Sequence, residues 1–175
     1  MNVEDAIRSR RAIRSYKDKE ISEGKLEEII DAVRMAPSAS NKQDWRFVFV
    51  TEGEKKEKLF EKANVQDFVK DAPVIVAGVT TDPEVEMTCG VPAGVVDLSI
   101  ALDHLTLKAA EEGLGTCWIA TFDQEKTKEV LEIPNEYRVI EIMTLGYPAE
   151  PLKREDKDRK ELEKIMFYNN FSESK

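Results

Sequence analysis

The stretch A-G-V-V-D-L-S-I-A-L-D-H-L-T-L-K-A-A-E-E, residues 93 to 112, is apolar on nearly every side. Twenty residues in helical geometry span about 30 Å. A helix without a polar face has to be covered all round. In a chain of 175 residues we expect a sheet and other helices to cover part of it, and a second copy of the chain to cover the rest. The stretch therefore predicts a long central helix that contributes to a homodimer interface.

Shorter helices and strands alternate on both sides of this segment. Leu26, Ile29, Ile30 and Val33 follow the spacing i, i+3, i+4, i+7, which predicts an amphipathic helix that begins after Ser22 and ends before the proline at 37. Helices packed on a central sheet indicate an α/β or α+β fold, and we expect residues 1–175 to form one domain. The other predicted helices are a short one after position 2, 54–63 and 123–134, and the predicted strands are 46–51, 73–80, 116–120 and 138–145. The last stretch still contains apolar residues at 162, 165, 166 and 167, which predicts a tail anchored to the body of the protein.

Composition excludes several classes of protein. The formal net charge is -9 with 35% charged residues, so the surface as a whole would repel nucleic acid. No stretch is long and apolar enough to span a bilayer, and the start M-N-V-E-D lacks the apolar core of a signal peptide, which predicts a cytoplasmic protein without a membrane partner. Cys89 and Cys117 form no C-x-x-C pair, and their surroundings predict buried free thiols.

The motifs of several enzyme classes are missing from the sequence. The chain has one histidine, His104, so a two-histidine metal site is excluded, and its place in the apolar helix favours a core or interface role. No phosphate-binding loop of the Walker or dinucleotide type follows a strand, and no G-x-S-x-G nucleophile motif occurs. The side chains alone therefore offer little catalytic equipment, and no catalytic side chain is assigned.

Two stretches are suited to ligand binding. The run I-R-S-R-R-A-I-R-S-Y, residues 7 to 16, has no acid between Asp5 and Asp18, which favours a phosphate site because guanidinium groups match phosphate geometry. The stretch A-P-S-A-S-N-K-Q-D-W, residues 36 to 45, is suited to a planar polar ligand or, equally, to an ordinary capping turn. A second basic cluster is mixed with acids, which favours a solvated face; it contains Lys153, Arg154, Lys157, Arg159 and Lys160.

Five motifs in register resemble the nitroreductase family of FMN-dependent oxidoreductases. They are R-R-A-I-R (10–14), A-P-S-A-S-N-K-Q-D-W (36–45), D-A-P-V-I-V (71–76), G-L-G-T-C-W-I (113–119) and R-K-E-L-E-K-I (159–165). The resemblance covers almost the whole chain. It implies an α+β fold in which helices flank a mostly antiparallel central sheet. It also implies an intertwined homodimer with one FMN in each of two clefts at the interface.

The resemblance also assigns positions to the cofactor-binding site. It implies that Arg10 and Arg14, with Arg11 and the backbone of Ala12 beside them, hold the phosphate and ribityl chain. It further implies that Lys157 and Arg159 join Arg10 at the phosphate, which leaves Arg8, Lys153 and Arg154 as surface charge. Ser38, Ala39, Ser40 and Asn41 would reach the flavin of the other protomer. Gln66 would contact the ring by its amide, and the backbone of Ile119, Ala120 and Thr121 would face the isoalloxazine edge, where an N–H can bond to N5.

The implied activity is transfer of electrons from NADH or NADPH, through FMN, to a nitroaromatic, quinone or similar small-molecule acceptor. The chemistry would belong to the cofactor, which agrees with the scarcity of catalytic side chains. A flavin-binding protein for storage or sensing remains an alternative, because the connection 81–92 is short and predicts an open or differently covered active site. A third alternative is an acidic dimeric interaction module without a cofactor. Two positions depart from the family pattern: Ala12 replaces a serine, and Asp44 replaces a proline and is expected to loosen its turn.

Overall fold

The computed structural model describes residues 1–153 and 157–171. The first half of the chain forms α1 (Val3–Ser9), α2 (Glu23–Arg34), the 3-10 turn η1 (Ala39–Asn41), β1 (Trp45–Val50), α3 (Gly53–Lys62), η2 (Asp67–Val69) and β2 (Val74–Thr80). The second half forms α4 (Ala93–Glu111), β3 (Gly115–Ile119), α5 (Gln124–Leu131), β4 (Arg138–Gly146) and η3 (Leu162–Lys164). The predicted helices and strands are all present, with boundaries that differ by a few residues.

The sheet has four strands in the order β1-β2-β4-β3, and each neighbouring pair is antiparallel. This confirms an α+β fold with an antiparallel sheet. The N-terminal segment lies along the outer edge of β3: Ala12 forms a parallel bridge with Thr116, and the N–H of Ile13 donates to the Thr116 carbonyl over 2.8 Å. The residues that follow α1 are thereby fixed to the sheet.

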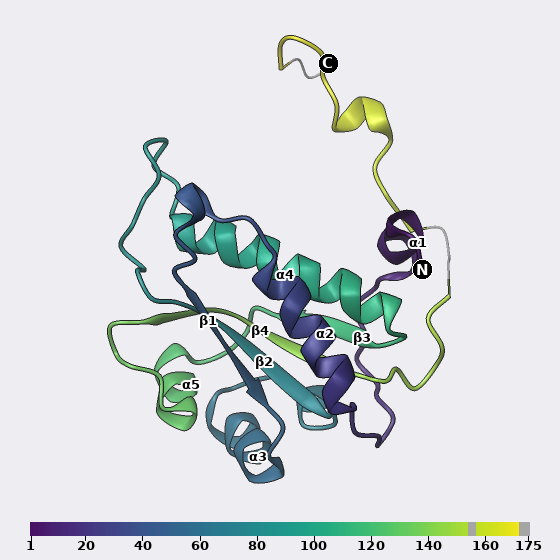
Figure 1. Cartoon of the computed structure of the whole chain (residues 1–175), viewed down its shortest axis with the longest axis vertical. Helices are drawn as coiled ribbons and strands as arrows, with labels where there is room; N and C mark the ends of the chain where they lie inside the picture. Colours follow the sequence, from purple (N-terminus) through teal and green to yellow (C-terminus); the bar gives the residue numbers. More distant parts are fainter. Residues whose placement is uncertain (154–156, 172–175) are drawn as a thin grey trace.

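Helices cover the two faces of the sheet, with α2 and α4 on one face and α3 and α5 on the other (Figure 1). Leu98, Leu102 and Leu105 of α4 are fully buried against Met143 and Leu145 of β4. Each side chain buried in this way contributes about 2 kcal/mol to the free energy of unfolding. The second core contains Leu59, Val65, Ile75, Leu131 and Ile142.

The central helix α4 covers residues 93–111, in agreement with the prediction for 93–112. Gly113 ends the helical stretch with a φ of 73°, a left-handed conformation that glycine adopts without a steric cost. The sheet, α1 and α2 cover most of α4, but Val95 near its first turn is 42% exposed. Within one chain the cover is therefore incomplete at the N-terminal end of the helix.

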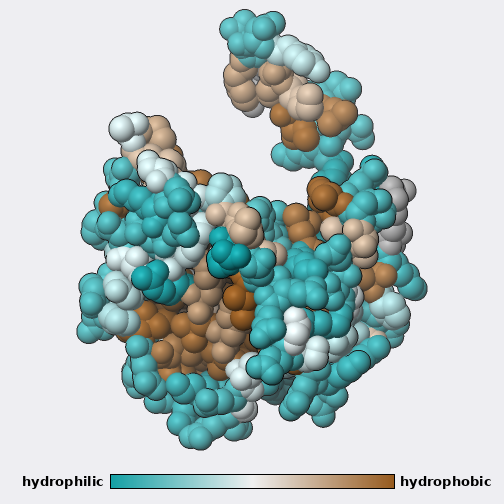
Figure 2. Space-filling model, viewed as in Figure 1, coloured by the Kyte–Doolittle hydropathy of each residue, from teal (hydrophilic) through white to brown (hydrophobic). Residues whose placement is uncertain are grey.

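The C-terminal segment differs from the expectation that its apolar residues anchor it. The C-terminal segment passes α1 and continues to η3, which stands away from the body of the protein (Figure 1). Leu162 and Ile165 are 62% and 56% exposed, and the Phe167 and Phe171 rings pack on each other with centroids 4.9 Å apart. Figure 2 shows the resulting apolar surface on this segment. The prediction was wrong for a single chain, because these apolar side chains are exposed and pack on one another rather than on the body.

The two cysteines also have different environments. Cys117 is buried in β3 as expected, whereas Cys89 is exposed. Cys89 lies at the tip of a turn in which the Gly90 N–H donates to the Met87 carbonyl over 2.8 Å, so its neighbours cannot cover it. Within the described ranges no helix combines the length and apolar character needed to cross a membrane.

Candidate functional site

Basic side chains from both ends of the chain meet beside α1. The Lys157 ammonium donates to the carbonyl of Ile7 over 2.6 Å, which ties the tail to the last turns of α1. Burial lowers the pKa of Lys157, and the nearby positive charges of Arg10, Arg159 and Arg11 lower it further. The structure thus brings these four predicted residues together. Cations that repel one another in this way would be stabilised by an anion bound between them. Arg154 lies outside the described residues.

The local sequence explains how the arginines reach this place. Asn2 caps α1 with a side-chain oxygen that accepts from the Asp5 N–H over 2.8 Å, and the helix ends at Ser9. Arg10 is extended, and the chain then follows the edge of β3. Gly115 permits this approach, because a Cβ atom there would lie 2.5 Å from Cγ1 of Ile13. Arg8 is instead exposed and paired with Glu4 over 2.9 Å, as expected for surface charge.

Arg14 lies on the other side of the N-terminal segment, against η2. Its guanidinium carbon lies 5.9 Å from the centroid of the Phe68 ring, and Gln66, the residue that precedes η2, is exposed nearby. The Tyr16 hydroxyl donates to the Ile13 carbonyl over 2.7 Å and lies 2.6 Å from the Thr144 hydroxyl. Burial raises the pKa of Tyr16 well above its ordinary range, so this phenol stays neutral and supports the backbone beside Arg14.

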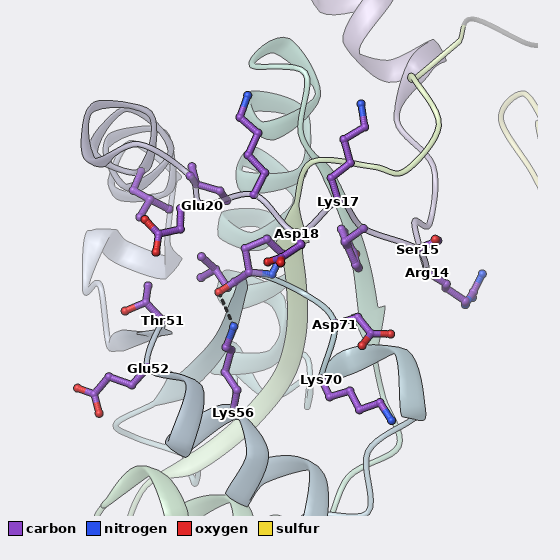
Figure 3. A pocket seen from close by; sticks show the side chains of 16 residues that line it. Arg14, Ser15, Lys17, Asp18, Glu20, Thr51, Glu52, Lys56, Lys70 and Asp71 are labelled. Atoms are coloured by element: carbon purple, nitrogen blue, oxygen red, sulfur yellow. Dashed lines mark hydrogen bonds between the residues drawn. The ribbon is translucent and has the colours of Figure 1, made fainter.

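A polar cavity of 890 Å³ opens beside Arg14. Figure 3 shows Arg14 and Lys70 on different walls of this cavity, with Asp71 between them in that view. Lys56 closes part of the wall by donating to the carbonyls of Ala72 and Pro73 over 3.1 and 3.0 Å. Lys70 was not among the site residues predicted from the sequence, although it follows the predicted residue Gln66 by only four positions.

The end of β3 contributes backbone rather than side chains. Ile119 is buried and pairs with Ile142, whereas Ala120 and Thr121 follow the strand and are exposed. Glu141, the neighbour of Ile142 on β4, is half-buried here, and one of its carboxylate oxygens is buried without a hydrogen-bond partner among the described residues. Burial raises the pKa of Glu141 to about 7, against the opposing effect of the Ile119 backbone. The sequence carried no signal for this carboxyl group.

The loop that contains Ser38, Ala39, Ser40 and Asn41 has an unusual backbone. Ser40, Asn41 and Gln43 have φ values of 51°, 55° and 56°, a left-handed conformation that costs about 1 kcal/mol for a residue with a side chain. The Ser38 hydroxyl oxygen accepts from the Gln43 N–H over 3.0 Å, which closes the loop on itself. The loop is therefore held in one specific shape.

Two further contacts fix this loop to the rest of the protein. Both carboxylate oxygens of Asp97 accept from the Ala39 N–H, at 3.0 and 3.2 Å. The carbonyl of Asp44 accepts from the Thr81 N–H over 3.1 Å and from the Thr80 hydroxyl over 3.4 Å. The turn before β1 is thus tied to the end of β2.

The predicted site residues form two groups at opposite ends of α4. The loop meets α4 at Asp97, whereas α1 packs near its other end, where the N-terminal ammonium lies 3.6 Å from Glu111 (Figure 1). The helix between Asp97 and Glu111 has a length of about 20 Å. One chain therefore places the arginines and the Ser38–Asn41 loop near opposite ends of α4. Ala120 lines a cavity with Thr80 and Gly94, at the N-terminal end of the helix.

Two other expectations concern metals and histidine. Nδ1 of His104 lies 3.3 Å from the Ala32 carbonyl, between α4 and α2, which agrees with a core role. Among the residues that the structure describes, no group of three or more His, Cys, Asp or Glu side chains is suited to a metal ion. What the arrangement offers is anion binding and backbone hydrogen bonds.

Comparisons with known proteins agree on one family. The model of the nitroreductase family matches residues 7–72 and 62–147. A relative from Methanothermobacter thermautotrophicus, which has the provisional name NADH dehydrogenase/NAD(P)H nitroreductase, is 37% identical over 171 residues, which cover 94% of this chain and 88% of the relative. The fold is similar to that of an FMN-dependent nitroreductase from Clostridium difficile R20291, with a TM-score of 0.78, 30% identity and coverage of 95% and 99%. It is also similar to NADPH:FMN oxidoreductase from Vibrio harveyi complexed with NAD+, with a TM-score of 0.87, 26% identity and coverage of 100% and 80%.

Proposed function

The chain belongs to the nitroreductase family, and from this premise we propose that it is an FMN-dependent oxidoreductase that oxidises NADH or NADPH and reduces a nitroaromatic, quinone or similar acceptor. The observation that carries the proposal is the meeting of Arg10, Arg11, Lys157 and Arg159 from the two ends of the chain. Residues 1–175 would act as one domain.

The basic group fits the phosphate of FMN. Arg10, Lys157 and Arg159 would hold the phosphate oxygens, because guanidinium and ammonium groups form charge-assisted hydrogen bonds with them. A bound dianion would also relieve the mutual repulsion that lowers the pKa of Lys157. The backbone of Ala12, fixed by its bridge to Thr116, would lie beside the ribityl chain.

The region around Arg14 fits the ring system of FMN. The resemblance places Arg14 at the phosphate and ribityl chain, but its position against Phe68 of η2 favours a role at the ring. Gln66 and Arg14 would orient the ring, and the exposed backbone of Ala120 and Thr121 would donate hydrogen bonds at its edge. When bound, FMN supplies the two-electron chemistry between nicotinamide and acceptor. Arg14 and Lys70 line a cavity that also contains four carboxyl groups, those of Asp18, Glu20, Glu52 and Asp71. No side chain has to act as a general acid or base, because the chemistry belongs to the flavin.

The cofactor would lie between two copies of the chain. The Ser38–Asn41 loop and the arginines lie at opposite ends of α4, so a loop from a partner copy would complete each site. The exposed apolar residues of the tail and the exposed Val95 of α4 support an intertwined homodimer, because they would be covered by the partner. Figure 2 also shows a hollow of apolar surface on the body of the protein that a second copy would cover.

The first experiment measures FMN affinity by titration of the apoprotein. Arg14→Ala is expected to weaken binding by about 1 to 3 kcal/mol, the value of a charge-assisted hydrogen bond. Arg8→Ala is the matched control, because Arg8 is an arginine of the same run whose contact is with exposed Glu4. Equal affinity in the two variants would show that the ring does not lie against Arg14.

A second experiment separates catalysis from storage. The holoprotein is mixed anaerobically with NADH and then NADPH, and the absorbance of the oxidised flavin is followed. We expect rapid bleaching with at least one of them. A flavin that stays oxidised with both would favour the storage or sensing role, and purified protein that takes up no FMN would favour an interaction module.

A further inference from the structure

Asp97 is a charged residue in a place where charge is costly. It lies one turn into α4, it is 7% exposed, and it is one of only two charged residues buried within the described ranges, the other being Lys128. Burying a carboxylate is unfavourable unless hydrogen bonds compensate it. Both of its oxygens lie within hydrogen-bond distance of one donor, the backbone N–H of Ala39. The contact joins the central helix to the start of the Ser38–Gln43 loop.

The loop needs such a contact because its backbone is not intrinsically stable. Three of its residues, Ser40, Asn41 and Gln43, are left-handed and none is glycine. Conformations of this kind persist only when the surrounding structure holds them, and they occur often at ligand sites. The bond from the Gln43 N–H to Ser38 closes the loop internally, but it does not fix the loop to the protein. At its start, the Asp97–Ala39 contact does so.

We propose that Asp97 is a positioning residue that fixes the Ser38–Gln43 loop in the shape in which it contacts FMN bound to a partner copy of the chain. The proposal rests on the FMN role of Ser38–Asn41 under the proposed function. Asp97 itself touches no cofactor, and it acts through the Ala39 N–H. A carboxyl group is suited to this task, because its oxygens can accept the hydrogen bond that the Ala39 N–H donates.

The first test compares FMN affinity in Asp97→Ala, Asp97→Asn and the control Asp103→Ala, an exposed aspartate on the same helix. Loss of a charge-assisted hydrogen bond predicts a rise of roughly 10- to 100-fold in the dissociation constant for Asp97→Ala. Asp97→Asn keeps an acceptor oxygen and is expected to restore most of the affinity. Asp103→Ala should match wild type. Wild-type affinity in Asp97→Ala would overturn the proposal.

A second variant removes the other half of the contact and leaves α4 intact. Ala39→Pro lacks the N–H that Asp97 accepts. It is expected to weaken FMN binding to a similar extent, and Ala39→Pro combined with Asp97→Ala should be no worse than the weaker-binding single variant, because the two changes break one contact. Additive losses would overturn the proposal.

A third measurement is independent of the cofactor. Hydrogen exchange of the Ala39 amide in the apoprotein should be slow in wild type and faster in Asp97→Ala, while the amides of β2 and β4 remain protected. Wild-type protein that binds no FMN would overturn the proposed function and the cofactor role of Asp97 together. Wild-type protein that binds FMN, with exchange at Ala39 unchanged in Asp97→Ala, would overturn only the role of Asp97.

Discussion

The two ends of α4 use charge in different ways. At the C-terminal end, Lys108 lies 2.7 Å from Glu28 of α2, 3.0 Å from Glu111 and 2.8 Å from Glu112, and Lys25 lies 2.8 Å from Glu112. At the N-terminal end, Asp97 meets a backbone N–H and a loop with left-handed residues. Opposite charges thus join two helices at one end, whereas a single carboxylate shapes a loop at the other.

This difference suggests that helix packing and the shape of the Ser38–Gln43 loop depend on separate charged groups along one helix. The C-terminal network is partly buried, with Lys108 21% and Glu112 18% exposed, so its charges are less screened than those of an isolated surface pair. It lies away from the Ser38–Gln43 loop. Changes to the Lys108 network should therefore alter the free energy of unfolding, and changes at Asp97 should alter cofactor affinity through the loop.

The largest change in the free energy of unfolding is expected from a substitution in the middle of α4, because both ends of the helix depend on its packing. Leu102 is fully buried, and its Cδ1 would lie 3.1 Å from a Cβ placed on Gly78. Leu102→Ala should lower the free energy of unfolding by about 2 to 5 kcal/mol, measured by urea denaturation. Ile30→Ala, at an apolar position 43% exposed, should cost less than about 1 kcal/mol. Similar costs for both variants would mean that α4 is not the centre of the core.

A smaller effect is expected from Lys108→Met, about 1 to 2 kcal/mol at pH 7, because three glutamates lose their shared cation. Hydrogen bonds from Lys108 and then Lys25 lower the pKa of Glu112 to about 2. A lowered carboxyl pKa gives stability that is present above the unfolded pKa and lost as pH falls toward 2. Wild type should therefore lose stability between pH 4.5 and 2, and the variant should lose less.

The control for this comparison is Lys126→Met, which breaks an exposed pair with Glu129 at 2.8 Å and should leave the free energy of unfolding close to that of wild type, because water screens the pair. FMN affinity should match wild type in both lysine variants. A loss of affinity in Lys108→Met alone would show that the two ends of α4 are coupled rather than separate.

Glu141 differs from the paired charges of α4, because one of its carboxylate oxygens has no hydrogen-bond partner among the described residues. Its substitution is expected to change the free energy of unfolding least. Burial raises its pKa to about 7, so the folded protein holds a proton that the unfolded chain releases near pH 4.5. Stability conferred by the proton is therefore lost as pH rises from 4.5 through 7. Glu141→Gln removes the charge and should be more stable than wild type at pH 8, on the order of 1 kcal/mol, with little difference at pH 4.5.

The matched control is Glu136→Gln, an exposed glutamate that precedes the same strand. Its unfolding free energy should follow that of wild type at both pH values. If Glu141→Gln shows no pH-dependent gain, the carboxyl group is solvated or paired in solution, and Glu141 then resembles the charges of α4.

Periodicity predicted most of the fold because each element carries its own pattern. The spacing of Leu26, Ile29 and Val33 identifies α2, and the continuous apolar run of 93–112 identifies α4. The tail was mispredicted because its apolar residues indicate a buried face, whereas the fold of the single chain leaves these side chains exposed. The exposure of Cys89 depends on a turn whose tip faces solvent, which composition cannot indicate.

Only those parts of the candidate site that lie within a single sequence motif could be predicted. The arginines and the small polar residues of 36–45 are visible in the sequence, but the contact from Asp97 to Ala39 spans 58 residues and has no local pattern. Left-handed backbone at Ser40 and Gln43 was equally hidden, because neither residue favours that conformation. The unpaired carboxylate oxygen of Glu141 follows from burial, which only packing decides.

The hydrogen bond between Lys157 and Ile7 joins positions 150 residues apart, and this has a consequence for folding. Contacts of such long sequence separation form late, because the intervening chain must first be ordered. During synthesis α1 leaves the ribosome early, but the lysine that meets it is added much later. The basic group that would hold a phosphate is therefore among the last parts of the protein to assemble, and uptake of cofactor by a refolding chain should report the final step of folding rather than an early one.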